Sequence, residues 1–84
     1  MNILFTDKVW EDYQYWAAND RTVLKRINRL IEECRRTPFE GTGKPEALKH
    51  QLAGYWSRRI TEEHRLVYTV DDGQLVIVAA RFHY

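Results

Sequence analysis

The 84-residue chain contains one cysteine, two prolines and four glycines, and its net charge is only +1. A single cysteine excludes an internal disulfide bond and suits a reducing compartment, so we expect a cytoplasmic protein. No apolar run approaches the roughly 20 residues that a membrane-spanning helix needs, and residues 1–5 are too short for a signal-peptide core. The sequence therefore predicts a globular protein without a membrane segment, folded as one domain over residues 1–84.

The small net charge hides an uneven distribution of charged side chains. Residues 1–20 carry four acidic side chains and one lysine, whereas residues 21–36 carry six basic side chains and two glutamates. The cations of residues 21–36 are explained by the solvated face of a helix. Arginines set into apolar strands, such as Arg65 and Arg81, are harder to explain in that way. They predict a basic face that attracts an acidic partner or nucleic acid.

The first half of the chain is typical of two helices. Apolar side chains recur at helical spacing over residues 7–18 and, more clearly, over residues 23–34. Asp20 is the expected N-cap of the second helix. Thr37-Pro38 ends that helix, because the residue before a proline avoids the α region. Residues 2–5 are a candidate short strand.

The second half of the chain predicts an antiparallel sheet. Three runs of mostly strand-forming residues, at 55–60, 64–70 and 74–82, are separated by short polar segments. The segment 71–73 (Asp-Asp-Gly) is typical of a tight hairpin turn. Residues 46–51 are expected to form a helical turn. Together these elements predict an α+β fold, in which a helical hairpin packs on one face of a small, mainly antiparallel twisted sheet.

Strand side chains alternate between the two faces of a sheet, which assigns each residue to a face. We expect the face beneath the helices to be formed by Leu66, Tyr68, Val70, Val76, Val78, Ala80 and Phe82. The opposite face then carries Arg65, Arg81 and His83. Glu46 and Lys49, three residues apart on the expected helical turn, lie over its rim.

A carboxylate, an imidazole and several fixed cations are sufficient to cleave RNA without a metal ion. Attack by the ribose 2′-hydroxyl needs a base, departure of the 5′-oxygen needs an acid, and the phosphorane between them needs positive charge. The candidates are Glu46, Lys49, Arg58, Arg59, Arg65, Arg81 and His83. By residue type alone, an ordinary structural role is the default for His83, is favoured for Glu46 and is a fair alternative for Arg65. Glu46 fits a carboxylate at a helix N-terminus, His83 a strand end in water, and Arg65 a surface ion pair.

Five stretches of the chain carry a family resemblance. They are residues 36–41 (RTPFEG), 43–46 (GKPE), 48–50 (LKH), 55–68 (YWSRRITEEHRLVY) and 81–84 (RFHY). Through them the whole chain resembles the YoeB-type toxins of bacterial toxin–antitoxin systems, within the RelE/ParE-like superfamily. The resemblance implies a fold like that of small microbial ribonucleases. It also implies an mRNA endoribonuclease that cleaves ribosome-bound message in the A site and inhibits translation.

The resemblance further implies a role for individual residues. Glu46 matches the general base, His83 the general acid and Arg65 the principal cation that stabilises the transition state. Lys49 and Arg59 match phosphate contacts. Tyr84 matches a neighbour that positions the substrate or His83. No metal ion and no cofactor are implied.

Some residues keep more than one interpretation. Arg58 and Arg81 fit phosphate contacts, and they fit equally well as partners of Glu62, Glu63 or the C-terminal carboxylate. Trp56 fits either the core or a ribosomal contact. We expect His50 and His64 to be structural and Cys34 to be a small core residue.

The resemblance and the charge pattern together imply partners. They are the ribosome with its A-site mRNA and a cognate, YefM-like antitoxin, whose acidic and initially disordered segment folds on binding. Trp10, Tyr13 and Trp16 are expected in the core, but their spacing fits an interface equally well, which leaves a homodimer open.

Two other functions remain compatible with the sequence. The first is a non-enzymatic, ParE-like toxin that binds and poisons a macromolecular target such as gyrase. It needs neither Glu46 nor His83. The second is a ribonuclease that acts on free RNA rather than on translated message.

Overall fold

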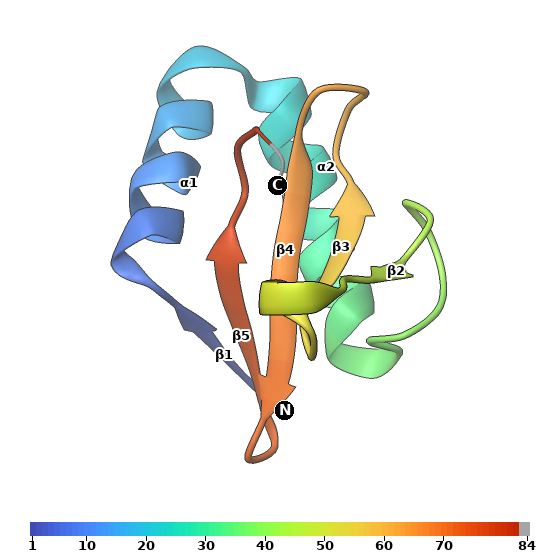
Figure 1. Ribbon diagram of the computed structural model, residues 1–84. Coiled ribbons are helices and arrows are strands. Elements are labelled where there is room, and N and C mark those ends of the chain that lie inside the picture. Colours follow the sequence, from blue (N-terminus) through green and yellow to red (C-terminus); the bar gives the residue numbers. More distant parts are fainter. Residues whose placement is uncertain (83–84) are drawn as a thin grey trace.

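Two consecutive helices lie against one face of a five-stranded sheet (Figure 1). The computed structural model describes residues 1–82. Its elements are, in chain order, β1 (Asn2–Phe5), α1 (Asp7–Asn19), α2 (Arg21–Arg36), β2 (Glu46–Ala47), the 3₁₀ helix η1 (His50–Leu52), β3 (Trp56–Arg59), β4 (Arg65–Asp71) and β5 (Gln74–Ala79). The strand order is β1-β5-β4-β3-β2, in which only the β1–β5 pair is parallel. The predicted α+β fold is confirmed.

Side chains at the helix ends satisfy backbone N–H groups that have no partner within the helix. The hydroxyl of Thr6 accepts a hydrogen bond from the N–H of Val9 (3.3 Å) at the start of α1. The carboxylate of Asp20 accepts hydrogen bonds from the N–H groups of Thr22 (3.1 Å) and Val23 (3.2 Å) at the start of α2. The predicted N-cap is therefore confirmed.

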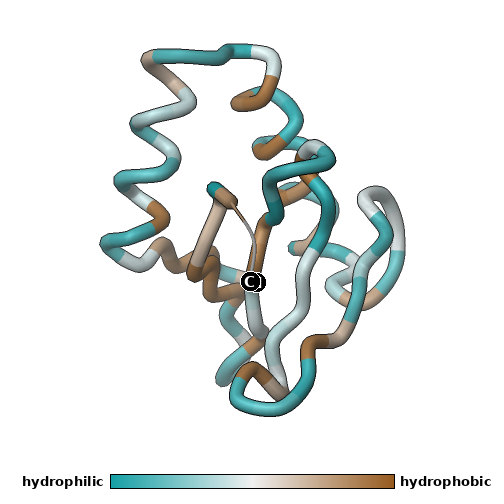
Figure 2. Tube along the Cα trace, turned by 45° about the horizontal axis from the view of Figure 1, so that its top comes forward, coloured by the Kyte–Doolittle hydropathy of each residue, from teal (hydrophilic) through white to brown (hydrophobic). Residues whose placement is uncertain are grey.

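The core lies between the helices and the central strands. The buried residues of α2 are Val23, Ile27, Leu30, Ile31 and Cys34, as its periodicity predicts. They belong to one cluster with Leu66, Tyr68, Leu75 and Ile77 of β4 and β5. In Figure 2 hydrophobic segments recur on one side of α2 and along the strands, while the connecting loops are mostly hydrophilic.

The phase of β5 differs from the predicted one. Leu75 and Ile77 lie opposite Val70 and Tyr68 of β4, and both are completely buried. The prediction that Val76, Val78 and Phe82 pack beneath the helices is wrong. The two valines are half-buried and alternate with the core residues Leu75 and Ile77, and Phe82 is 51% exposed. Ala80 is in the core as predicted.

A β-bulge explains why part of the predicted phase is right and part is wrong. Tyr68 and Val67 of β4 pair with Ile77 and Ala79, which leaves Val78 as an extra residue on β5. One extra residue reverses the phase of every side chain that follows it. In this apolar run either phase offers hydrophobic residues to the core, so alternation alone does not select one.

Glu46 lies in a short edge strand, and the predicted helical turn at 46–51 is wrong at its start. Glu46 pairs with Ser57 of β3, and the N–H of Leu48 donates to the carbonyl of Tyr55 (2.9 Å), which extends the hairpin. Helical geometry begins only at His50. Pairing with β3 therefore outweighs the weak local preference of this segment for a helical turn.

The aromatic residues of α1 occupy different environments. Trp16 is 6% exposed and donates from Nε1 to the carbonyl of Ala80 (2.8 Å). Tyr13 is half-buried against the core, whereas Trp10 is 55% exposed, so the prediction of a core Trp10 is wrong. Asp12 is buried instead and accepts a hydrogen bond from the N–H of Ala80 (3.0 Å). Within residues 1–82 no helix has the length and apolar character needed to cross a membrane.

Candidate active site

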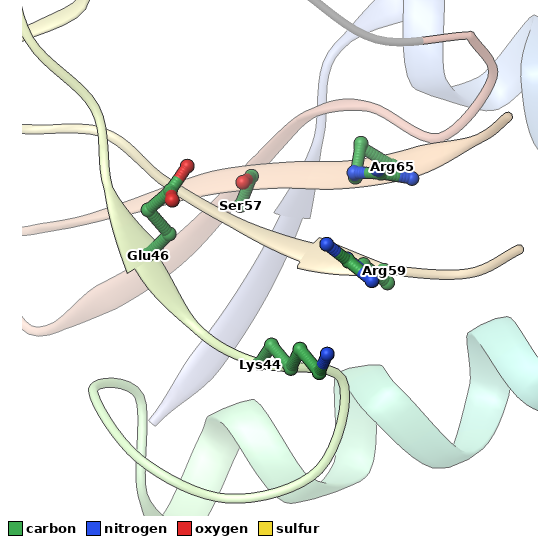
Figure 3. Close-up of a pocket in the computed structure, with 5 residues that line it drawn as sticks. All are labelled: Lys44, Glu46, Ser57, Arg59 and Arg65. Carbon is green, nitrogen blue, oxygen red and sulfur yellow. The ribbon is translucent and has the colours of Figure 1, made fainter. Parts of the chain in front are cut away.

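A pocket of about 140 Å³ opens on the face of the sheet opposite α2 (Figure 3). Its lining residues are Lys44, Glu46, Ser57, Arg59 and Arg65. Glu46 comes from β2, Ser57 and Arg59 from β3, and Arg65 from β4. Because strand side chains alternate, Ser57 and Arg59 share this face while the intervening Arg58 points into the core.

Strand register places the charged groups at two ends of the pocket. Glu46 pairs with Ser57, and two residues further along β3 Arg59 pairs with Arg65. In Figure 3 the Glu46 carboxylate lies at the Ser57 end, and the two guanidinium groups lie at the other end. Like charges directly opposite each other on neighbouring strands are unfavourable. Within residues 1–82 neither arginine forms an ion pair with a carboxylate. An anion bound between them would relieve this repulsion.

Arg65 is held in place by backbone carbonyls. Its Nη1 donates to the carbonyl oxygens of Thr61 (2.8 Å), Glu62 (2.9 Å) and His64 (3.2 Å), which close the turn between β3 and β4. These acceptors are neutral, so the guanidinium keeps its full charge for a ligand. A cation that is positioned before the ligand arrives needs little reorganisation when negative charge develops beside it.

A buried arginine organises the loop that leads into the pocket. The side chain of Arg58 is completely buried, and its Nε donates to the hydroxyl of Tyr68 (3.0 Å). Its Nη1 and Nη2 groups donate to Glu33 Oε1 and to the carbonyl oxygens of Thr37, Glu40 and Thr42. One side chain thus ties the segment 37–42 to β3. The sequence predicted a phosphate contact or a pair with Glu62, Glu63 or the C-terminal carboxylate. The carboxylate partner within residues 1–82 is Glu33, which was not predicted, and the complete burial of Arg58 removes it from phosphate binding.

Two glycines in this loop have conformations that a side chain does not tolerate. Gly41 has φ +120°, and a Cβ there would collide with Glu33 Oε1. Gly43 has φ +87°, and a Cβ there would crowd Arg58, Arg59 and Leu30 at 3.2 Å. The N–H of Arg59 donates to the carbonyl of Gly43 (2.7 Å), which sets Lys44 beside Arg59. Glycine at 43 is therefore needed to close the pocket from the loop side.

The buried network shifts several pKa values. The N–H of Thr42 donates to Glu33, and together with the Arg58 charge it holds the pKa of that carboxyl below its ordinary value. Burial raises the pKa of Tyr68 to about 12, although the hydrogen bond from Arg58 opposes the shift. Burial likewise raises the pKa of the Cys34 thiol, which agrees with its predicted role as a core residue. Glu33, Cys34 and Tyr68 lie on the core side of the sheet and are not among the residues that line the pocket.

The structure brings some of the predicted residues together and adds two. Glu46, Arg59 and Arg65 meet in one pocket, whereas Lys49 is not among its lining residues. Lys49 lies exposed just before η1, where the backbone is extended instead of forming the predicted helical turn. Lys44 and Ser57 were not predicted. Ser57 lies two positions before Arg59, so strand alternation contained the signal for it.

His83 and Tyr84 lie outside the described residues, and their predicted roles stay predictions. The structure does describe Arg81, whose guanidinium lies 3.5 Å from the centre of the Tyr15 ring of α1. The prediction that Arg81 shares the face of Arg65 is therefore wrong: β5 ends at Ala79, so strand alternation no longer places Arg81, and its side chain lies against α1. Trp56, for which the sequence allowed two environments, is half-buried against the core and lies 4.9 Å from the ring of Phe39.

A family model described as a YoeB-like toxin of bacterial type II toxin–antitoxin systems matches residues 5–84. The chain belongs to this family. It is 63% identical to the toxin YoeB of Streptomyces coelicolor and 58% identical to that of Escherichia coli K12, in both cases over the whole length of both chains. The protein is thus a toxin of a type II toxin–antitoxin system.

Solved structures agree with this assignment. The YoeB/ParE toxin from Agrobacterium tumefaciens superimposes with a TM-score of 0.97 at 50% identity, over all of both chains. The toxin chain of a heterotetrameric YoeB–YefM complex from Staphylococcus aureus superimposes with a TM-score of 0.91 at 49% identity, over 100% of this chain and 98% of that one. A chain of a YoeB dimer from the same organism superimposes with a TM-score of 0.92 at 49% identity, over 100% of this chain and 98% of that one.

Proposed function

We propose that this toxin is a ribosome-dependent mRNA endoribonuclease that cleaves message in the A site. One observation carries the proposal: two opposed arginines without carboxylate partners in residues 1–82 share a pocket with the carboxylate of Glu46. The arginines attract an anion, and a carboxylate beside that anion is placed to act as a base. A phosphodiester next to a ribose hydroxyl satisfies both.

In the proposed mechanism Glu46 takes the proton of the ribose 2′-hydroxyl while the 2′-oxygen attacks phosphorus. Arg65 and Arg59 stabilise the charge that develops on the phosphoryl oxygens. The bond from phosphorus to the 5′-oxygen then breaks, and His83 supplies the proton to the departing oxygen. The products are a 2′,3′-cyclic phosphate and a 5′-hydroxyl end. No step uses a metal ion or a cofactor.

Three further residues bind the message in this proposal. Lys44 lines the pocket and contributes a third cation. Lys49 contacts a phosphate outside the pocket, from its exposed position before η1. Tyr84 positions the substrate or His83. We assign these residues to binding rather than to proton transfer.

The proposed partners are the ribosome, an antitoxin and a second copy of the chain. The solved YoeB–YefM complex supports a YefM-like antitoxin, and the cationic pocket suits an acidic segment of it. The solved YoeB dimer supports a homodimer, for which the exposed Trp10 of α1 is a candidate contact. Translating ribosomes place the site of action in the cytoplasm.

The test is cleavage of translated message by purified protein, with the message ends mapped. Glu46→Gln and His83→Ala are expected to fold and to lose roughly 10²- to 10⁴-fold in rate. Glu11→Gln, an exposed carboxylate of α1, is the matched control and should cleave like the wild type. A 2′-deoxy sugar at the scissile nucleotide should stop the reaction, and EDTA should not.

Two results would reject the proposal in favour of the alternatives. Growth inhibition by the double variant Glu46→Gln, His83→Ala would favour a non-enzymatic toxin that poisons a target such as gyrase. Equal cleavage of translated and untranslated message would favour a ribonuclease that acts on free RNA. Cleavage that survives the 2′-deoxy substitution would remove the mechanism itself.

A further inference from the structure

The chain segment after β5 is fastened by side chains from α1 and by the start of β4. Ala80 is held from both sides, since its N–H donates to Asp12 Oδ2 (3.0 Å) and its carbonyl accepts from Trp16 Nε1 (2.8 Å). Phe82, the last described residue, is also held from both sides. Its N–H donates to His64 Nδ1 (2.7 Å), and its carbonyl accepts from the N–H of Arg65 (2.8 Å).

Phe82 has a backbone conformation that needs such support. Its φ is +61°, in the left-handed region that bulky side chains rarely adopt. A residue stays in this region only when its surroundings hold it there. The Phe82 side chain is 51% exposed, so its own packing is not enough. The two backbone hydrogen bonds must therefore define the conformation.

His64 is built to accept one of these bonds. Its side chain is 12% exposed, and its ring stands edge-on to Trp16 at 4.8 Å. Because Nδ1 accepts the bond from Phe82, the ring proton of the neutral imidazole resides on Nε2. Nε2 lies 3.5 Å from the carboxylate of Glu63, which favours that tautomer. The packing and the carboxylate therefore both present Nδ1 as an acceptor.

We propose that His64 is a positioning residue for cleavage, acting through the hydrogen bond from the Phe82 N–H. It fixes the peptide between Arg81 and Phe82, directly before the one that leads into His83, the proposed general acid, so this inference rests on the proposed function. Within residues 1–82, His64 is not among the residues that line the pocket. Arg65 connects the pocket to the segment that His64 holds, because its side chain lines the pocket and its N–H donates to the Phe82 carbonyl.

Two amide variants separate the acceptor from the rest of the side chain. In His64→Asn the amide oxygen occupies the place of Nδ1 and keeps the bond from Phe82. In His64→Gln the amide reaches the place of Nε2 instead and loses it. His50→Asn is the matched control, since His50 is an exposed histidine on η1.

The expected kinetic result is a split between the two variants. His64→Gln should lose roughly 10²-fold in single-turnover kcat on ribosome-bound message with KM unchanged, the size of effect that a misplacement of about 1 Å produces. His64→Asn and His50→Asn should stay near the wild type. Equal losses in His64→Asn and His64→Gln, or no loss in His64→Gln, would overturn the inference.

Nuclear magnetic resonance of the wild type tests the bond itself, independently of any variant that fails to fold. A scalar coupling across the hydrogen bond is expected between the Phe82 amide nitrogen and His64 Nδ1, and its absence would overturn the inference. The two proposals fail differently. A wild type that does not cleave ribosome-bound message rejects the proposed function, and the role of His64 in cleavage with it. A wild type that cleaves, beside an equally active His64→Gln, rejects only the role of His64.

Discussion

Replacing Arg58 by methionine tests whether one buried side chain holds the loop that leads into the pocket. Methionine matches the arginine side chain from Cβ to Nε, so the packing of this stem is largely kept while all donors are removed. Arg58 makes five hydrogen bonds, to Tyr68, Glu33, Thr37, Glu40 and Thr42. All five acceptors lose this donor in the variant.

The expected loss is large for a chain of this size. Five hydrogen bonds at about 0.5–1.5 kcal/mol each give roughly 2.5–7.5 kcal/mol. We therefore expect the free energy of unfolding to fall by about 3–5 kcal/mol. Typical values of about 0.05–0.15 kcal/mol per residue give roughly 4–13 kcal/mol for the whole protein. The substitution removes a major part of that.

The measurement is urea unfolding followed by tryptophan fluorescence. With a slope of about 1–2 kcal/mol/M, the midpoint of Arg58→Met should fall by roughly 1.5–5 M. Arg58→Lys keeps the charge but reaches fewer acceptors, so its midpoint should be intermediate. Arg29→Met, on the exposed face of α2, is the control and should change stability by at most about 0.5 kcal/mol.

Hydrogen exchange shows whether the loss is local to the loop. The Thr42 N–H donates to Glu33 Oε1 (2.6 Å), and Glu33 is held by Arg58, so this amide should exchange faster in Arg58→Met than in Arg29→Met. Equal midpoints and equal Thr42 exchange in the two variants would refute the role of Arg58. A lower midpoint without faster exchange at Thr42 would refute the specific link to the loop.

Three further predictions concern other buried polar groups. Asp12→Ala leaves the Ala80 N–H without its acceptor and should lower the free energy of unfolding by about 1–3 kcal/mol; Asp12→Asn should recover part of this in thermal unfolding, and equal losses would contradict the role of the acceptor. The folded state retains the Tyr68 proton up to about pH 12, whereas the unfolded state loses it near pH 10.0, so stability should fall between these values by roughly 2–3 kcal/mol. Tyr68→Phe should remove this dependence, and an unchanged alkaline limb would count against it. The pKa of Glu33 is lowered in the folded state, so the ionised carboxylate stabilises the fold above pH 4.5, and this stabilisation is lost as the pH falls through the lower folded value. Glu33→Gln should flatten the acid limb of the curve of unfolding free energy against pH. An acid limb as steep as that of the wild type would contradict this.

The elements that the sequence predicted well depend on neighbours in the chain. The apolar stripe of α2 follows helical spacing, and Asp20 caps it by reaching N–H groups only two and three residues away. The hairpin turn at 71–73 is also local. Asp72 and Gly73 both have positive φ, which Asp-Gly accepts more readily than most pairs. Short-range rules suffice wherever the partners are a few residues apart.

The errors have one physical origin, since each involves partners distant in the chain. The bulge at Val78 depends on the register in which β4 pairs with β5, and no residue type in β5 predicts it. Glu46 is in a strand because β3 offers it a partner, although Glu46 and its neighbours favour a helical turn locally. Trp10 and Trp16 follow the same helical pattern, but only Trp16 faces the core.

For the candidate site, the residue types and the family were determined by the sequence alone: a carboxylate, several arginines and stretches that match YoeB-type toxins. The tertiary structure decided which of these groups meet. Strand register set Arg59 against Arg65, loop closure by Arg58 brought in Lys44, and the hairpin put Glu46 at the pocket instead of on a helix. Composition and spacing state what chemistry is available. Only the pairing of distant strands states where it is assembled, because that pairing is chosen by the burial of the whole core.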